Sequence, residues 1–183
     1  MPSIHAYYHS DGPASGPVTI DYLGALGWNI SFIEGNTIEE IEQSGFKVVE
    51  KMGYPTTVEG CVVRFNMKQA EDMTPQMLSV LEASQPSDGV TGNLCTNQDA
   101  ITAITSGKTY IDIEDITTKS WIHLDLFPGL LLTLPQGAKY RLNFNAENSK
   151  TTRTVFFLEN HEILMDEAIE THPARAAYLA KHT

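Results

Sequence analysis

The stretch "WIHLDLFPGLLLTLPQGAKYRLNF", residues 121–144, carries the strongest fold signal in the chain. Its apolar residues alternate or run together over strand lengths, and Gly129, Pro135 and Gly137 interrupt them. Apolar runs separated by turn residues in this way are typical of antiparallel strands. The stretch therefore predicts successive strands joined by tight turns.

The same pattern continues on both sides of this stretch. Residues 100–115, "AITAITSGKTYIDIED", and residues 153–160, "RTVFFLEN", are strand-length runs rich in β-branched and aromatic residues. Several short antiparallel strands at this spacing indicate a barrel or a sandwich. We expect one domain, residues 1–183, with its core barrel strands in residues 86–162.

The first part, residues 1–85, is a mixture of strand and helix signals. A strand is expected in residues 3–9, whereas residues 18–33 are ambiguous between helix and strand. Residues 37–54 predict an amphipathic helix that starts with a capping box of Thr37 and Glu40 and is broken near Gly45. Residues 72–86 predict a second, short helix. These elements would pack against the barrel.

The last part, residues 163–183, predicts a C-terminal helix. Thr171 or His172 precedes Pro173, and proline is favoured in the first turn of a helix. Alanines follow, and alanine has the highest helix propensity.

Charge limits the classes of partner that the protein can have. The chain carries 12 basic and 23 acidic residues, a net charge of −11. Such a chain is repelled by nucleic acids and by anionic membranes, so we expect a small-molecule ligand as partner. No apolar segment is long enough to span a bilayer, and the N-terminus lacks a signal-peptide pattern, which favours a cytoplasmic protein. The oligomeric state stays open.

The cysteines and histidines give no metal-binding pattern. Cys61 and Cys95 stand alone, and none of the six histidines forms an H-x-H or H-E-x-x-H pair. We therefore expect neither a metal site nor another cofactor.

The β-rich half resembles the cupins, and the whole chain resembles the acireductone dioxygenases within that superfamily. The resemblance rests on "TSGKTYIDIED", residues 105–115, followed by the stretch 121–144. Gly129, Pro135 and Gly137 match the cupin pattern G-x5-P-x-G. The resemblance implies a mainly β fold, a cupin (double-stranded β-helix, jelly-roll) barrel with N-terminal helices and a short C-terminal helix.

Carried over residue by residue, the resemblance implies that the metal ligands have been replaced. Leu94 and Thr96 stand where the family has two histidines, Ala100 where it has a glutamate, and Tyr140 where it has a last histidine. Thr102 stands in place of an arginine that could meet an anionic substrate.

A shift of register does not restore these ligands, because residues 86–105 contain neither histidine nor glutamate. An iron or nickel site needs imidazole and carboxylate donors that converge on one ion. A metal-dependent dioxygenase is therefore disfavoured.

Alternation along the strands predicts what replaces the metal site. Residues two apart on a strand share a face, so the replaced positions would form an apolar pocket with a few hydroxyl groups. Our candidate catalytic residues are Tyr140, His123 and Thr102. Our candidate substrate-binding residues are Leu94, Thr96, Ala100, Ile104, Leu142, Phe144 and Arg64.

Tyr140 would donate a hydrogen bond or a proton to a carbonyl group. His123, the only histidine in the β core, would be an acid or base if it points inward, and Trp121 would then share its face. The alternative is that aromatic side chains simply fill the former cavity.

Two classes of function follow. The first is a metal-independent cupin enzyme that isomerises, dehydrates or cyclises a small, largely apolar organic metabolite, in a specialised (secondary) metabolite pathway. The second is a non-catalytic cupin that binds a small molecule or a protein. Holding a flexible substrate in a reactive shape needs few catalytic groups, so the enzyme is chemically feasible. The intact framework beside a changed pocket favours the enzyme, because a pure interaction module would not require hydroxyl groups in its interior.

Overall fold

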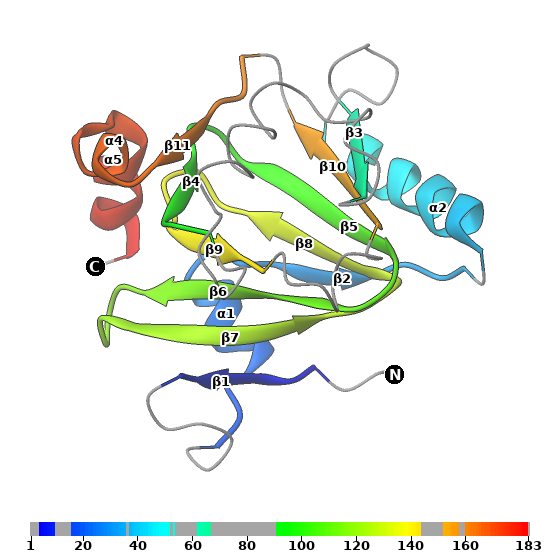
Figure 1. Cartoon of the computed structure of the whole chain (residues 1–183), viewed down its shortest axis with the longest axis horizontal. Coiled ribbons are helices and arrows are strands. Elements are labelled where there is room, and N and C mark those ends of the chain that lie inside the picture. The colour runs from blue at the N-terminus through cyan, green and yellow to red at the C-terminus, as the bar shows by residue number, and fades with distance from the viewer. Residues whose placement is uncertain are drawn as a thin grey trace.

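Two antiparallel sheets form the frame of the protein and enclose its main core (Figure 1). Sheet A runs in the order β1 (Ala6–Tyr8), β7 (Ser120–Leu126), β6 (Thr109–Asp115), β9 (Tyr140–Leu142), β4 (Leu94–Thr96) and β11 (Ile163–Met165). Sheet B runs in the order β2 (Ile30–Phe32), β8 (Leu130–Leu134), β5 (Ala100–Ser106), β10 (Thr152–Phe157) and β3 (Val62–Asn66).

This computed structural model describes residues 4–9, 16–35, 37–51, 53, 62–66, 91–143, 152–157 and 160–182. The expected helix in residues 72–86 lies outside these ranges. The strands expected within residues 100–115 and 121–144 are present, as β5 to β9.

Alternation along the strands separates a core face from an outer face. In β6 and β7, Ile111 lies opposite Leu124 and Ile113 opposite Ile122, and all four side chains are fully buried. The intervening residues of both strands point to the other side of sheet A. The main core therefore lies between the sheets, as the period-two pattern predicts.

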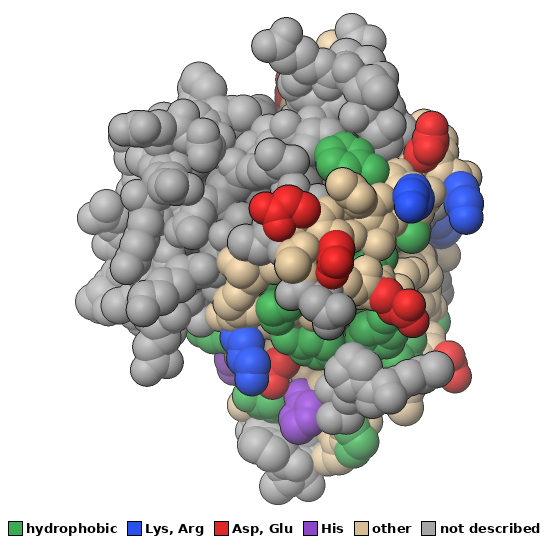
Figure 2. All heavy atoms as spheres, turned by 90° about the vertical axis from the view of Figure 1, so that its right-hand side faces the viewer, with side chains coloured by type: hydrophobic (Ala, Val, Ile, Leu, Met, Phe, Trp, Pro, Cys, Tyr) green, Lys and Arg blue, Asp and Glu red, His purple; other side chains and the backbone are tan. Residues whose placement is uncertain are grey.

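Helix α2 (Ile38–Lys51) covers the outer face of sheet B. Its predicted capping box is present: the Thr37 amide donates to the Glu40 carboxylate, and the Glu40 amide donates to the Thr37 hydroxyl, both at 3.2 Å. Ile41 packs there against a second buried cluster that includes Ile101 and Leu131. Charged side chains occupy the surface on this side of the molecule (Figure 2).

Two expectations change in the N-terminal part. Helix α2 is not broken at Gly45 but continues from residue 38 to residue 51. Residues 18–33, which were ambiguous, contain both kinds of element: α1 (Ile20–Ala25), capped by the Thr19 hydroxyl, and then β2. A glycine with positive φ, Gly27, lies in the turn between them.

The C-terminal segment begins with strand β11 and continues into α4 (Glu167–Thr171) and α5 (Pro173–His182). Helix α5 begins at Pro173, as predicted, and packs on the turn between β8 and β9. Gly137 in this turn has a φ of 79°, and a Cβ there would lie 2.1 Å from the Ala174 carbonyl oxygen. Only glycine allows the helix to approach so closely.

No helix among the described residues has both the length and the apolar character needed to cross a membrane.

Asp115, at the end of β6, ties the N-terminal elements to sheet A. Its buried carboxylate accepts hydrogen bonds from the Tyr8 hydroxyl at 2.6 Å, the Tyr22 hydroxyl at 2.8 Å and the Thr118 hydroxyl at 2.9 Å. Burial alone would raise the pKa of this carboxyl group, but the hydrogen bonds outweigh burial and lower it.

We expect Asp115→Asn to lower the free energy of unfolding at neutral pH by about 2 kcal/mol, because hydrogen bonds to a charged acceptor are lost. Since the folded pKa is lowered, the stabilisation is complete above the unfolded pKa of about 4 and is lost as the pH falls through the folded value. Urea unfolding at neutral pH and at a series of pH values below the unfolded pKa measures this loss of stabilisation.

The exposed Glu50→Gln is the matched control for this experiment. It should change stability little at any pH. An equal pH dependence of stability in Asp115→Asn and in the unmodified chain would contradict the assignment.

Candidate functional site

The register of β6, β7 and β9 places Tyr140 and His123 on opposite faces of sheet A. Tyr140 lies opposite Ile113 on the core face, whereas Asp112 lies opposite both Arg141 and His123 on the outer face. Trp121 shares the outer face with His123. These two catalytic candidates therefore do not lie in one site. His123 points outward, so it does not reach the barrel interior.

The barrel interior collects most of the other predicted residues. Ala100, Thr102 and Ile104 are buried on one face of β5, as alternation predicts. Tyr140 is 3% exposed and packs edge-on against Trp28, with 6.0 Å between the ring centroids. Leu94 is also buried in this core.

Two buried hydroxyl groups in this interior lack a hydrogen-bond partner. Thr102 in sheet B is 2% exposed and Thr96 in sheet A is 1% exposed. Among the described residues, no group makes a hydrogen bond to Oγ1 of Thr96 or to Oγ1 of Thr102. Thr96 is two residues from the core residue Leu94 and so points the same way. Thr96, Thr102 and Tyr140 together are called the inner site below.

The remaining predicted residues are only partly placed. Leu142 is half-buried and packs against the main core. Arg64 lies in β3, where only its backbone is described. Phe144 lies outside the described residues.

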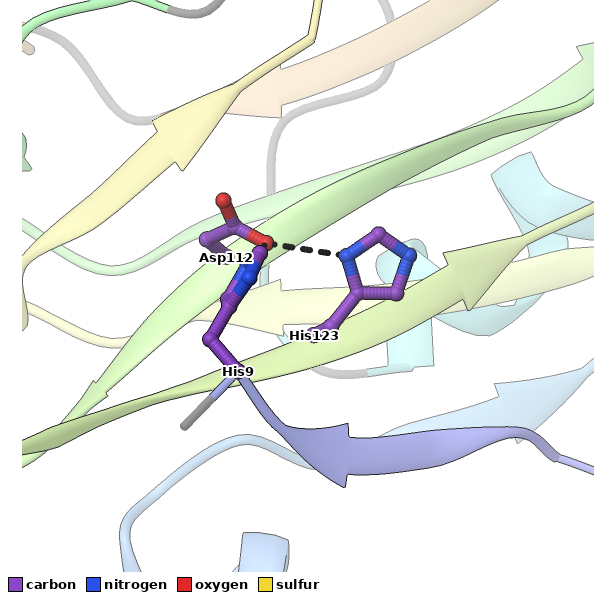
Figure 3. A group of neighbouring side chains, drawn as sticks. All are labelled: His9, Asp112 and His123. Atoms are coloured by element: carbon purple, nitrogen blue, oxygen red, sulfur yellow. Dashed lines mark hydrogen bonds and ion pairs between the residues drawn. The ribbon is translucent and has the colours of Figure 1, made fainter. Parts of the chain in front are cut away.

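A second group of chemically active side chains lies on the outer face of sheet A. His9, Asp112 and His123 offer one potential ligand atom each, and these atoms lie within 4.8 Å of one another (Figure 3). Asp112 Oδ1 is 2.8 Å from His9 Nε2 and 3.1 Å from His123 Nδ1. These three residues are called the outer cluster below.

Backbone pairing and ring contacts fix the outer cluster. Tyr7 of β1 lies opposite His123, and the His9 amide donates to the Trp121 carbonyl at 3.0 Å. The His123 ring stacks on Tyr7 at 4.9 Å and lies 4.2 Å from the ring of Tyr110.

Asp112 is nearly inaccessible, with a side chain that is 6% exposed. Burial raises the pKa of its carboxyl group, but the hydrogen bonds with His123 and His9 outweigh burial, and the net shift is downward. Asp112 is therefore held as a carboxylate, which can accept protons or bind a cation.

Sequence analysis did not find His9 and Asp112 as site residues and did not expect a metal-binding group. Positions 9, 112 and 123 share no local motif, so spacing along the chain could not reveal them. The available signal was alternation, which would have grouped Asp112 with His123 if the β6–β7 pairing had been known.

Comparison with known proteins supports the fold only. No protein-family model matches the chain, and no curated protein matches it. Among solved structures, an acireductone dioxygenase from Bacillus anthracis with a cadmium ion in its active centre is 16% identical, with a TM-score of 0.51. That match covers 78% of this chain and 84% of the other.

Two further solved structures match more weakly. Oxalate decarboxylase from Bacillus subtilis is 8% identical over 57% of this chain and 27% of its own, with a TM-score of 0.35. Procruciferin, an 11S globulin from Brassica napus, is 16% identical over 43% of this chain and 20% of its own, with a TM-score of 0.36. Taken with the two-sheet architecture, the acireductone dioxygenase match shows that the chain has a cupin fold.

We expect Thr102→Val to raise the free energy of unfolding of the ligand-free protein by about 1 kcal/mol, because it removes a buried hydroxyl that lacks a partner. Thr91→Val is the matched control, since the buried Thr91 hydroxyl accepts a hydrogen bond from the Leu142 amide at 2.9 Å. Thr91→Val should lower the free energy of unfolding by about 1 kcal/mol. Denaturant unfolding measures both, and a loss of stability in Thr102→Val would show that its hydroxyl is satisfied.

Proposed function

We propose that this cupin-fold protein binds a small, largely apolar organic molecule at the inner site and converts it by isomerisation, dehydration or cyclisation. The observation that carries the proposal is the pair of unpaired hydroxyls of Thr96 and Thr102 inside the barrel. Buried polar groups are nearly always hydrogen-bonded. Two buried hydroxyls without partners therefore suggest that a bound molecule supplies the hydrogen bonds. A ligand oxygen between the sheets would supply them.

The side chains at the inner site favour chemistry without a metal in the barrel. The four positions that the resemblance to acireductone dioxygenases equates with metal ligands hold Leu94, Thr96, Ala100 and Tyr140. Alkyl groups and neutral hydroxyls are poor donors for iron, nickel or zinc ions, which prefer imidazole, thiolate and carboxylate. These residues do not fit a resident metal ion.

The same side chains suit a reaction that moves only protons. Apolar walls exclude water and hold a flexible molecule in one shape, which can supply much of a rate enhancement. Tyr140 would donate its phenolic proton toward a carbonyl oxygen, with Thr96 and Thr102 orienting the molecule. Isomerisation, dehydration and cyclisation need no external oxidant or reductant. His123 takes no part here, because it lies on the opposite face of sheet A.

We further propose a specialised metabolite as the substrate and a soluble, cytoplasmic setting. Biosynthetic genes beside the coding gene would support the first, and recovery in the soluble cell fraction would support the second. A non-catalytic binding protein would use the same inner site, so binding and turnover must be measured separately.

Ligand binding at the inner site should be visible in the fluorescence of Trp28. The chain has two tryptophans, so Trp121→Phe leaves Trp28, which is fully buried against Tyr140, as the only reporter. Titration with cyclohexenone and hydroxylated cyclic ketones should quench the emission in a saturable way. Adding Thr102→Val should weaken binding roughly fivefold, the effect of one lost hydrogen bond of about 1 kcal/mol.

A control for this titration is the surface cleft of about 670 Å³ that includes Lys108, Asp125 and Phe127 in its lining. A compound bound there would keep its affinity in the Thr102→Val protein. Equal affinity with and without the Thr102 hydroxyl, for every compound that quenches Trp28, would contradict binding at the inner site.

For a substrate that the protein converts, Tyr140→Phe should lower the turnover number about 100-fold, because it removes the proton donor and preserves the ring. Tyr110→Phe is the matched control, since Tyr110 lies beside His123 on the outer face. The turnover numbers of both variants, measured by steady-state kinetics, test whether Tyr140 is the proton donor. Unchanged turnover in Tyr140→Phe would remove Tyr140 from the mechanism, and binding without turnover in the unmodified protein would favour the non-catalytic alternative.

A further inference from the structure

We propose that the outer cluster is a binding site for a divalent transition-metal ion, with His9 Nε2, Asp112 Oδ1 and His123 Nδ1 as protein ligands. The site lies on the outer face of sheet A, away from the inner site, and does not depend on the proposed function.

Two of the three distances between donor atoms are close to the spacing that such an ion requires, and all three atoms lie within 4.8 Å of one another. Ligand atoms at about 2.1 Å from a tetrahedral zinc ion lie about 3.4 Å from one another. Asp112 Oδ1 lies 2.8 Å from the His9 nitrogen and 3.1 Å from the His123 nitrogen. Small outward rotations of the two rings would therefore admit the ion (Figure 3).

The two nitrogens of His123 give an independent argument. Nε2 is 3.3 Å from Asp125 Oδ1, and Nδ1 is 3.1 Å from Asp112 Oδ1, so a carboxylate faces each side of the ring. A neutral imidazole has only one N–H. If that N–H points to Asp125, the lone pair on Nδ1 points toward Asp112, which is the orientation in which Nδ1 and the Asp112 oxygen can bind the same cation.

Asp125 adds a feature that is common beside histidine ligands of metal ions. Histidine ligands of metals usually donate their second N–H to a carboxylate, which sets the tautomer and the ring orientation. Asp125 is placed for that role. The His123 ring also stacks on Tyr7 and contacts the tilted ring of Tyr110, and these contacts restrict its rotation.

The donor set and the exposure select the class of ion. Two imidazoles and one carboxylate suit Zn²⁺, Co²⁺, Ni²⁺ or Cu²⁺, whereas Mg²⁺ and Ca²⁺ prefer oxygen ligands throughout. The His9 side chain is 50% exposed, whereas that of Asp112 is 6% exposed. The ion would thus sit at the surface, with positions left for water or another small ligand.

Isothermal titration of chelator-treated protein with Zn²⁺ tests the proposal. We expect one equivalent of Zn²⁺ to bind with a micromolar or lower dissociation constant. His9→Gln and Asp112→Asn should each weaken binding at least tenfold, and Asp125→Asn should weaken it about tenfold through loss of the supporting carboxylate. His182→Gln, on α5, is the matched histidine control and should leave the affinity unchanged.

The coordination itself can be read from spectra. Cu²⁺ bound at the outer cluster should show nitrogen superhyperfine splitting from two imidazoles, and His9→Gln should reduce it to one. His9 is half-exposed, so its substitution leaves the core unchanged even if Asp112→Asn does not fold. Failure of the protein to bind Zn²⁺ below millimolar concentrations would overturn the proposal, as would equal affinity in the unmodified and His9→Gln proteins.

Discussion

The pairing of β6 with β7 is the constraint on which both faces of sheet A depend. Ile113 meets Ile122 on the core face, and Asp112 meets His123 on the outer face. A slip of one residue would bring the carboxylate and the imidazole into the apolar core and turn the isoleucines outward. Burial of ionisable groups away from compensating partners costs several kcal/mol, so one register is strongly preferred.

The same register places the inner site on one side of sheet A and the outer cluster on the other side. β9 joins the far edge of β6, which brings Tyr140 opposite Ile113 and so into the interior. The interior then offers hydroxyl groups among alkyl and aromatic side chains, the surroundings on which our proposal of a small-molecule ligand rests. The outer face offers imidazoles around a buried carboxylate, which bind protons or cations. Because no side chain belongs to both faces, each can be altered without direct effect on the other.

The features that could be predicted from the sequence are those that a local signal specifies. Three predicted features are present: the capping box of Thr37 and Glu40, the start of α5 at Pro173, and strand alternation across residues 100–142. Each depends on neighbours a few residues apart. The break expected at Gly45 is absent, because packing of α2 on sheet B outweighs the weak helix propensity of one glycine. The orientation of His123 could not be predicted, because it depends on which strand pairs with β7 and in which register.

The sequence by itself determined a mainly β chain with cupin-like turns at Gly129 and Gly137. These properties follow from residue type and short-range spacing. The replacement of metal ligands at positions 94, 96, 100 and 140 stays a prediction that rests on the resemblance to acireductone dioxygenases. Only the tertiary structure decided that Tyr140 and His123 lie on opposite faces, and that His9 reaches Asp112 and His123. The faces of Tyr140 and His123 depend on how β6 pairs with β9 and with β7. His9 and Asp112 are 103 positions apart, and only the pairing of β1, β6 and β7 brings them within hydrogen-bond distance.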